Sequence, residues 1–156
     1  MSKAILLSIK PKYVADILNG KKTIEIRKQI LKCKLPIDVY IYCTQKPGYL
    51  TKEKWKIDWI GYIKTKKELL NGKVVAKFKL KKIEKIQVGF DEDSWEHYYF
   101  IRDKELTEKA CVSNNELNNY LQGNNGYAWF IDDLKVFANP KELTSKAPQS
   151  YCYIDK

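Results

Sequence analysis

The segment from Val74 to Ile83 constrains the fold most, because its side chains alternate in character. One set of alternate positions is apolar, namely Val74, Ala76, Phe78 and Leu80. The positions between them hold Val75 and three lysines, Lys77, Lys79 and Lys81. Successive side chains of a strand point to opposite faces, so this pattern predicts a half-buried strand with a basic outer face. A basic strand face suits phosphate groups, and we expect the three lysines to be phosphate-binding residues.

Apolar and β-branched runs predict further strands. Three of them cover residues 4–9, 23–28 and 38–44. Residues 126–137 predict one long strand or two short ones, and the apolar carboxyl-terminal segment, residues 147–155, predicts a final edge strand.

Two short helices are predicted between these strands. A proline at its start and a glycine at its end bracket a helix over residues 12–18. A serine with a glutamate three residues later predicts a capped helix over residues 113–123. Residues 91–108 predict a helix and loops, and residues 45–72 predict a loop insertion with some local structure. Five or six strands with two short helices predict an α+β fold, a small mixed β-barrel with peripheral helices.

Length and composition are typical of one domain, residues 1–156, whose core needs no metal or disulfide. No apolar run approaches a membrane span, and the start lacks a secretory h-region, so we expect a cytoplasmic protein without membrane contact. His97 is the only histidine, and no CxxC pair occurs among the cysteines, Cys33, Cys43, Cys111 and Cys152. We therefore expect buried thiols, no metal, no cofactor and no serine-histidine-aspartate triad.

The formal net charge is +10, from 29 basic and 19 acidic residues. A balance this basic favours polyanionic partners, most often nucleic acid. The simpler alternative is a lysine-rich surface that only maintains solubility. Lysine outnumbers arginine heavily, which favours diffuse attraction to phosphates over bidentate recognition of base edges.

The motif GKKTIEIR places charged side chains on a predicted strand. Strand geometry puts Thr23, Glu25 and Arg27 on one side, and Ile24 and Ile26 on the other, where they can fill the core. In a cleft, the carboxylate would accept hydrogen bonds from the amino edge of a base, and the guanidinium would donate to carbonyl or phosphate oxygens. On a solvated face, the same charges would form a surface salt bridge that contributes little to stability. The spacing alone leaves both alternatives open.

Together with the upstream segment SIKP, residues 8–11, this motif resembles the ASCH domain of the PUA-like β-barrel superfamily. The hallmark of that family is a SIKP-type first strand, a short helix and then GxKxxExR. This chain has the second element in register, at Gly20, Lys22, Glu25 and Arg27. The later stretches YIYCT, NGKVVAKF, GYAW and APQSYCY resemble a subgroup common in low-GC bacteria and their phages. The likeness covers both ends of the chain and leaves two internal stretches poorly matched.

The resemblance implies a barrel with a cleft between the first strand and the GxKxxExR strand, in a family regarded as recognising nucleic acids or modified bases. The ligand-binding residues that it implies are Ser8, Lys10, Lys22, Glu25 and Arg27. Thr44, Trp129 and Tyr151 follow from their proximity in that fold. The two rings would let a base stack, which contributes about 1–3 kcal/mol per base. Trp129 fits plain core packing equally well.

A related bacterial branch of ASCH proteins is known for amide hydrolysis of N4-acetylcytidine. It resembles this chain at GKKTIEIR, with Lys22 at its catalytic lysine. That branch has threonine where this chain has Glu25, so the hydroxyl that would attack the amide or orient water is absent. Lys22 and Glu25 remain candidate catalytic residues, because a desolvated lysine beside a carboxylate can transfer protons.

The leading hypothesis is non-catalytic binding of RNA, another single-stranded nucleic acid or a modified nucleoside, with lysines holding phosphates and a polar, aromatic cleft holding a base. One alternative is a small hydrolase, either N4-acetylcytidine amidohydrolase-like or a ribonuclease, which catalytic turnover would reveal. The other is a phage or host regulatory module that binds protein. A large exposed apolar patch around Trp55, Trp59 and Tyr62 would favour that module.

Overall fold

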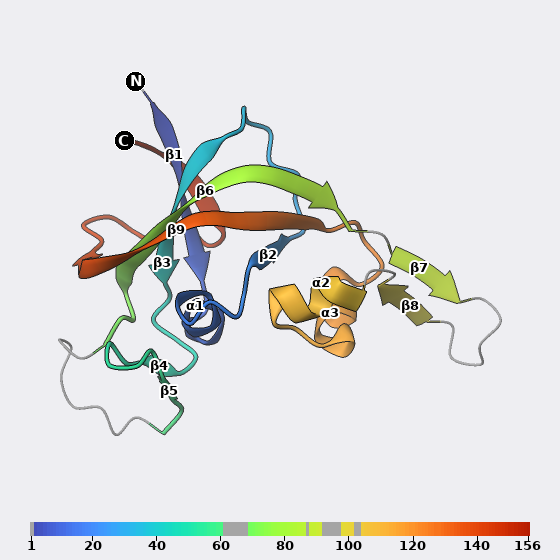
Figure 1. Ribbon diagram of the computed structural model, residues 1–156, viewed down its shortest axis with the longest axis horizontal. Coiled ribbons are helices and arrows are strands. Elements are labelled where there is room, and N and C mark those ends of the chain that lie inside the picture. Colours follow the sequence, from blue (N-terminus) through green and yellow to red (C-terminus); the bar gives the residue numbers. More distant parts are fainter. Residues whose placement is uncertain (1, 61–68, 87, 92–97, 102–103) are drawn as a thin grey trace.

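The fold is built on one six-stranded mixed sheet, and the computed structural model in Figure 1 describes residues 2–60, 69–86, 88–91, 98–101 and 104–156. The strand order is β10-β1-β3-β6-β9-β2, in which β1 and β3 are parallel and all other neighbours are antiparallel. The strands are β1 (Lys3–Ile9), β2 (Ile24–Arg27), β3 (Ile37–Cys43), β6 (Lys73–Lys85), β9 (Tyr127–Glu142) and β10 (Tyr151–Asp155).

Helices and two small hairpins surround this sheet. The helices are α1 (Pro11–Leu18), α2 (Lys104–Ala110) and α3 (Asn114–Leu121). The hairpins pair β4 (Tyr49–Leu50) with β5 (Ile57–Asp58), and β7 (Val88–Asp91) with β8 (Tyr98–Ile101). The sheet curls into a half-barrel, which confirms the predicted α+β barrel-like fold. Within the described part of the chain, no helix is both long and apolar enough to cross a membrane.

The curl of the sheet comes from β6 and β9, which run together across the molecule in Figure 1. Their register shifts at three places along the ladder, and such bulges bend a strand and increase its twist. As a result β2, which pairs with the first four residues of β9, lies near the carboxyl-terminal end of β1, and both line one pocket. The single long strand over Tyr127–Glu142 decides between the two alternatives that the sequence left open.

One of these bulges corrects the predicted pattern of β6. Val75 was expected on the basic outer face, but its side chain is 1% exposed and belongs to the main core. The register shift between Val74 and Ala76 turns two successive side chains, those of Val75 and Ala76, into the core. Val74, which precedes them, is only half-buried. From Ala76 onward the predicted alternation holds, with Phe78 and Leu80 in the core.

The molecule has two apolar clusters. The main core lies between the concave face of the sheet and α1, where Ile5, Val39 and Phe78 meet Val14 and Ile17. The second cluster packs α2 and α3 against β2 and consists of Ile24, Ile26, Ile86, Leu106, Ala110, Leu117, Leu121 and Ala128. The two isoleucines of GKKTIEIR therefore fill a core, as the alternation predicted, and this core places α3 beside the charged face of the motif.

The helical predictions are confirmed with one exception. Ser113 caps α3 by accepting a hydrogen bond from the backbone N–H of Glu116 at 3.1 Å. Residues 91–108 were expected to form a helix and loops; α2 is that helix, but Tyr98–Ile101 form a strand. The aromatic and β-branched run YYFI has high strand propensity, which the acidic surroundings obscured. His97 lies outside the described residues.

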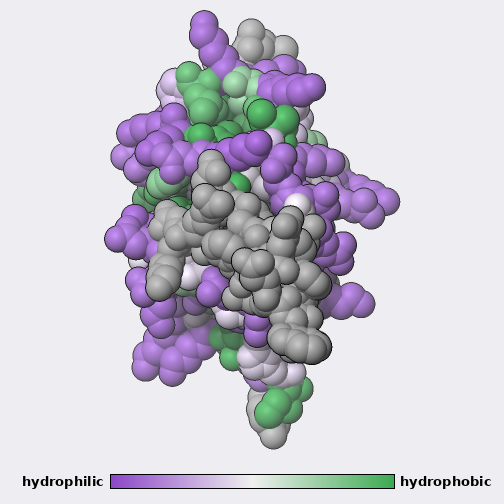
Figure 2. Space-filling model, turned by 90° about the vertical axis from the view of Figure 1, so that its right-hand side faces the viewer, coloured by the Kyte–Doolittle hydropathy of each residue, from purple (hydrophilic) through white to green (hydrophobic). Residues whose placement is uncertain are grey.

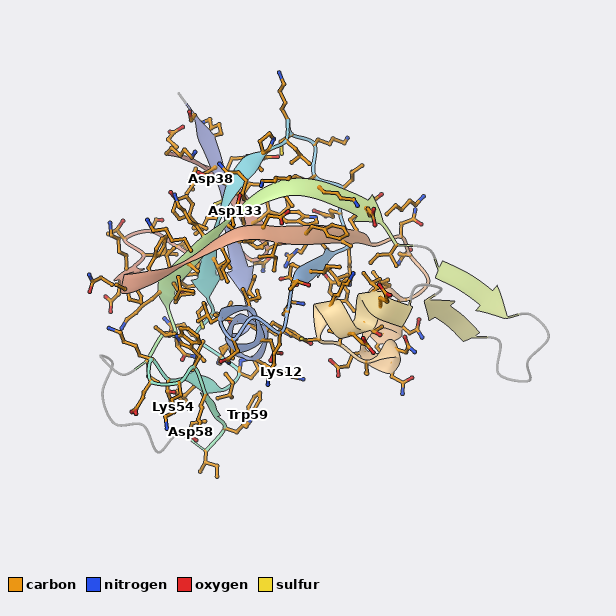
Figure 3. The ribbon with its side chains drawn as sticks, in the orientation of Figure 1. Lys12, Asp38, Lys54, Asp58, Trp59 and Asp133 are labelled. Atoms are coloured by element: carbon orange, nitrogen blue, oxygen red, sulfur yellow. The ribbon has the colours of Figure 1, made fainter. Side chains whose placement is uncertain are left out.

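The predicted insertion, residues 45–72, contains the β4–β5 hairpin as its local structure. At its end Trp59 is 59% exposed and Ile60 is 76% exposed, and Figure 3 shows Trp59 directed away from the sheet. Trp55 instead packs against the main core, and Tyr62 is not among the described residues. The described part of this patch is therefore the exposed chain directly after β5.

Asp38 on β3 generates a prediction about acid stability. Its carboxylate is 7% exposed and lies 2.5 Å from the Nζ atoms of both Lys156 and Lys79. Hydrogen bonds from Lys156 and then Lys79 lower the pKa of Asp38 below 3.8. This group therefore stabilises the folded state above pH 3.8 and loses that effect as the pH falls through its lowered pKa.

Asp38→Asn should accordingly reduce the free energy of unfolding by about 1–2 kcal/mol at neutral pH. Urea denaturation across a pH series should show the difference shrinking below pH 3.8. Asp155→Asn, which removes an exposed partner of Lys3, is the control and should change stability by less than ~1 kcal/mol. A difference for Asp38→Asn that is independent of pH would contradict this account.

Candidate functional site

A pocket of about 490 Å³ opens where the end of β1, the start of α1, β2 and α3 converge. Its lining consists of Ser8, Ile9, Lys10, Tyr13, Lys22, Glu25, Ile26, Arg27, Lys28, Thr44, Lys46, Val112, Glu116, Leu117, Tyr120, Gln149 and Ser150. The sequence-predicted residues Ser8, Lys10, Lys22, Glu25, Arg27 and Thr44 all lie on this pocket. Chain segments distant in sequence are thus brought to one cavity by the curl of the sheet.

The floor of the pocket is a buried ion pair. Lys22 is 2% exposed, and its Nζ donates to the carbonyl oxygen of Ala110 at 2.6 Å and lies 3.5 Å from Oε1 of Glu25. Glu25 is 7% exposed, and the same Oε1 accepts the backbone N–H of Ile26 at 3.1 Å. This burial excludes the surface salt bridge that the spacing had left open.

Arg27 extends the charged floor toward the carboxyl-terminal segment. Its Nη1 lies 3.9 Å from Oε2 of Glu25, and its Nη2 donates to Oγ of Ser150. Ser8 holds the same segment in place, because its Oγ donates to the carbonyl oxygen of Pro148 at 2.7 Å. The two ends of the chain therefore form one wall, and Arg27 is oriented by partners on both sides.

Two tyrosines supply the aromatic surface of the pocket. Tyr13 on α1 donates a hydrogen bond to Glu116 on α3 at 3.2 Å, and the ammonium of Lys22 lies 5.1 Å from its ring centre. Burial, together with the charge of Glu116, raises the pKa of Tyr13 to about 12. Lys28 lies 4.6 Å from the ring centre of Tyr120, which is 38% exposed.

Sequence reasoning missed Tyr120, Glu116, Lys28, Lys46 and Ser150. α3 lies far from the motif in sequence, so only the second apolar cluster reveals that it borders the pocket. Lys28 directly follows the motif and could have been found there. Tyr13 belongs to the segment that carried the family resemblance, and its position in the first turn of α1 was the available signal.

The structure does not bring Trp129 and Tyr151 to the pocket lining. Trp129 is fully buried in the main core, which decides for core packing, and its indole Nε1 has no hydrogen-bond partner among the described residues. Tyr151 packs beside it, with ring centres 5.9 Å apart. Trp129 pairs with Glu25 across the β2–β9 ladder, so the two side chains lie on the same face of the sheet.

The three lysines of β6 also lie away from the pocket lining. Lys79 is bound to Asp38, and Lys81 lies 2.9 Å from Asp133; Figure 3 labels both carboxylates. Lys77 instead lies 5.9 Å from the ring centre of Tyr40. Of the three lysines, Lys77 is thus the one whose ammonium is not paired with a carboxylate of the described residues. Phosphate binding by the three lysines stays a prediction.

The donor set of the pocket suits an organic ligand rather than a metal ion. In the described ranges, no cluster of three or more histidine, cysteine or acidic side chains could hold a metal. The four cysteines are free thiols, but the expectation of buried thiols holds for Cys43 alone, and the other three are half-buried. Burial raises the pKa of Cys43 to about 12. Chemically, the pocket offers two carboxylates, those of Glu25 and Glu116, several cationic donors and two rings.

A search of solved structures matches the chain to the crystal structure of ASCH from Zymomonas mobilis, with 20% sequence identity and a TM-score of 0.64 over 98% of this chain and 88% of that chain. A serine-to-alanine and a tyrosine-to-phenylalanine mutant of that protein match at 19% and 18% identity, with TM-scores of 0.64 and 0.63. Both cover 98% of this chain, and 89% and 91% of their own. No protein-family model and no curated protein matches.

The chain therefore has the ASCH fold, which confirms the resemblance drawn from its motifs. At this sequence identity the likeness concerns the fold, because unrelated functions share folds. What the pocket does has to be argued from its own side chains.

The buried pair yields a prediction about stability. Lys22→Met should reduce the free energy of unfolding by about 3 kcal/mol, because it removes the nearer of the two cations beside the buried Glu25 carboxylate and the donor to the Ala110 carbonyl. The double variant Lys22→Met/Glu25→Gln should recover most of that loss, giving a coupling energy of about 1–3 kcal/mol in a double-mutant cycle. Urea denaturation measures all four proteins.

Lys21→Met, a substitution at the exposed neighbouring lysine, is the matched control and should change stability by less than about 0.5 kcal/mol. Strictly additive effects of the two substitutions at Lys22 and Glu25 would show that the two charges do not stabilise each other.

Proposed function

We propose that the pocket binds one base, with its phosphate, of RNA, of another single-stranded nucleic acid or of a modified nucleotide. The supporting observation is the fixed Glu25–Arg27 pair beside tyrosine rings and lysines within one cavity. The cavity of about 490 Å³ falls in the range of ~300–1,000 Å³ typical of small-molecule sites.

The carboxylate and guanidinium suit the edge of a base. Oε1 of Glu25 is held by Lys22 and by the backbone of Ile26, which fixes the side chain. An ionised carboxylate has about four acceptor sites, so Oε2 can accept from an amino or imino group of a ligand. Arg27 uses one donor on Ser150 and has others for carbonyl or phosphate oxygens.

The remaining lining suits the ring and the phosphate of a nucleotide. Tyr13 and Tyr120 are the stacking surfaces, in place of the tryptophan that the sequence suggested. Lys10, Lys28 and Lys46 are exposed side chains of the lining and can neutralise a phosphate. The chain's net charge of +10 attracts a polyanion to this rim. On the face turned to the viewer in Figure 2, hydrophilic side chains predominate around smaller apolar patches.

Substitutions in the pocket test this proposal. Glu25→Gln and Arg27→Gln should each weaken binding of ribonucleoside 5′-monophosphates by about 1–3 kcal/mol, which is about 5- to 150-fold, because each leaves a ligand group without its partner. Isothermal titration with the common bases and with modified nucleosides measures the loss.

Lys82→Gln removes the same unit charge at an exposed side chain that is paired with Glu84, and should leave affinity unchanged. If the pocket variants bound every nucleotide as tightly as Lys82→Gln does, the pocket would not be the site.

A second candidate is hydrolysis of acylated pyrimidine nucleosides, supported by the buried lysine–carboxylate pair at the floor of the pocket. Amide hydrolysis through lysine requires an unprotonated amine or a proton relay to water. The Nζ of Lys22 is instead committed to the Ala110 carbonyl and to Glu25, an arrangement that favours positioning over nucleophilic attack. We therefore place binding ahead of catalysis.

Turnover separates these two functions. Wild-type protein incubated with N4-acetylcytidine should release no acetate, as monitored by proton NMR. Glu25→Thr, which restores the threonine of the amidohydrolase branch, is the matched variant, and release of acetate by this variant alone would mark a binding relative of an enzyme. Sustained wild-type turnover would replace binding by hydrolysis as the function.

A further inference from the structure

A second groove, with a cavity volume of about 730 Å³, lies over the other face of the sheet from the main core. Its lining comes from β1, β3, β6, β9, β10 and the segment that follows β9. It shares no lining residue with the candidate nucleotide pocket. The groove thus needs an explanation of its own.

The groove is built on one cross-strand row. Leu6 on β1 pairs with Tyr40 on β3, Tyr40 pairs with Lys77 on β6, and Lys77 pairs with Lys135 on β9. Directly paired residues lie on the same face of a sheet, so this row presents an apolar, an aromatic and two basic side chains in sequence. Phe137 adds a second ring, 6.2 Å from that of Tyr40.

The charges of this groove are uncompensated. Lys77, Lys135 and Lys141 line it with a single carboxylate, Glu142. Over the described residues, none of the three lysines lies within ion-pair distance of an acidic group. Lys79, further along the same face of β6, is by contrast neutralised by Asp38. These three lysines, placed around a tyrosine and a phenylalanine ring, suit a single-stranded nucleic acid, because the ammonium groups can bind its phosphates and the rings can contact its bases.

The groove adjoins the pocket along two chain segments. Leu6 lines the groove and Ser8 lines the pocket, and two residues of a strand span only ~7 Å. The segment after β9 does the same, since Ser145 borders the groove and Ser150 borders the pocket. The two cavities therefore border the same two segments of the chain.

We propose that this groove binds the phosphodiester backbone of a single-stranded nucleic acid next to the nucleotide in the pocket. Lys77, Lys135 and Lys141 hold phosphates, and the rings of Tyr40 and Phe137 form an apolar floor under the bases. The partner is thus a polymer rather than a free nucleoside. This inference rests on the proposed function for the nucleotide in the pocket, whereas the groove residues themselves belong to a separate surface.

Length dependence tests the inference. Fluorescence anisotropy with a labelled oligoribonucleotide of about 12 nucleotides, inside the ~4–16-nucleotide range of small β-barrel sites, measures polymer binding. Titration with ribonucleoside 5′-monophosphates measures the pocket alone. Lys77→Gln/Lys135→Gln should weaken oligonucleotide binding roughly 25-fold at ~0.1 M salt and lower the salt slope by about 1.4, while mononucleotide affinity stays unchanged.

The matched control is Lys3→Gln/Lys82→Gln, which removes the same charge at exposed lysines paired with Asp155 and Glu84. Equal oligonucleotide affinities of the groove and control variants would overturn the inference and leave the pocket proposal standing. If the groove variant lost oligonucleotide binding and the wild type bound no mononucleotide, the groove would be supported as a nucleic-acid site and the proposal for the pocket would be refuted. Tighter binding of polyglutamate than of the oligonucleotide would overturn the inference in favour of an acidic protein partner.

Discussion

The ammonium group of Lys22 lies in the interior between the carbonyl oxygen of Ala110 and the carboxylate of Glu25. A charge this deeply buried is tolerated only when it is paired and hydrogen-bonded. The contact joins the turn before β2 to the end of α2, and the backbone N–H of Thr23 joins the same place by donating to the Lys109 carbonyl at 2.8 Å. The second apolar cluster then holds α3 over the pocket.

The same interaction decides what the pocket can offer a ligand. A free glutamate side chain would have to lose rotamer entropy on binding, whereas Glu25 is already fixed by Lys22, by the backbone of Ile26 and by proximity to Arg27. A preorganised acceptor and a preorganised donor, side by side, suit the edge of a base. The commitment of Lys22 to this role is also what separates the site from one built for attack by a lysine amine.

The alternation of GKKTIEIR sufficed to place Ile24 and Ile26 in a core and Glu25 and Arg27 on the opposite side, but it left open whether that side is a cleft or a solvated face. Its spacing could not show burial, because that depends on the Ala110 carbonyl, which lies far away in sequence. Local chemistry likewise predicted the α3 cap, but not that Tyr120 faces the pocket.

The errors have the same origin in long-range geometry. The bulge in β6, which turns Val75 inward, is set by pairing with β9 and leaves no mark in the local pattern. Trp129 could not be assigned from its apolar neighbours, since both a core and an aromatic wall would be flanked in that way. The alternating lysines of β6 could be found in the sequence, but the carboxylates that pair with two of them, Asp38 and Asp133, lie on other strands.

The most direct test of the central claim is a chemical-shift map of the labelled protein titrated with nucleoside monophosphates. Amide signals of residues 8–10, 22–28, 116–120 and 149–150 should move together, with a common dissociation constant, because these segments meet at one pocket. Selective side-chain labelling should show the Arg27 guanidinium shifting with them. Shifts confined to other surfaces, or no saturable shifts with any nucleotide or modified nucleoside, would contradict the account.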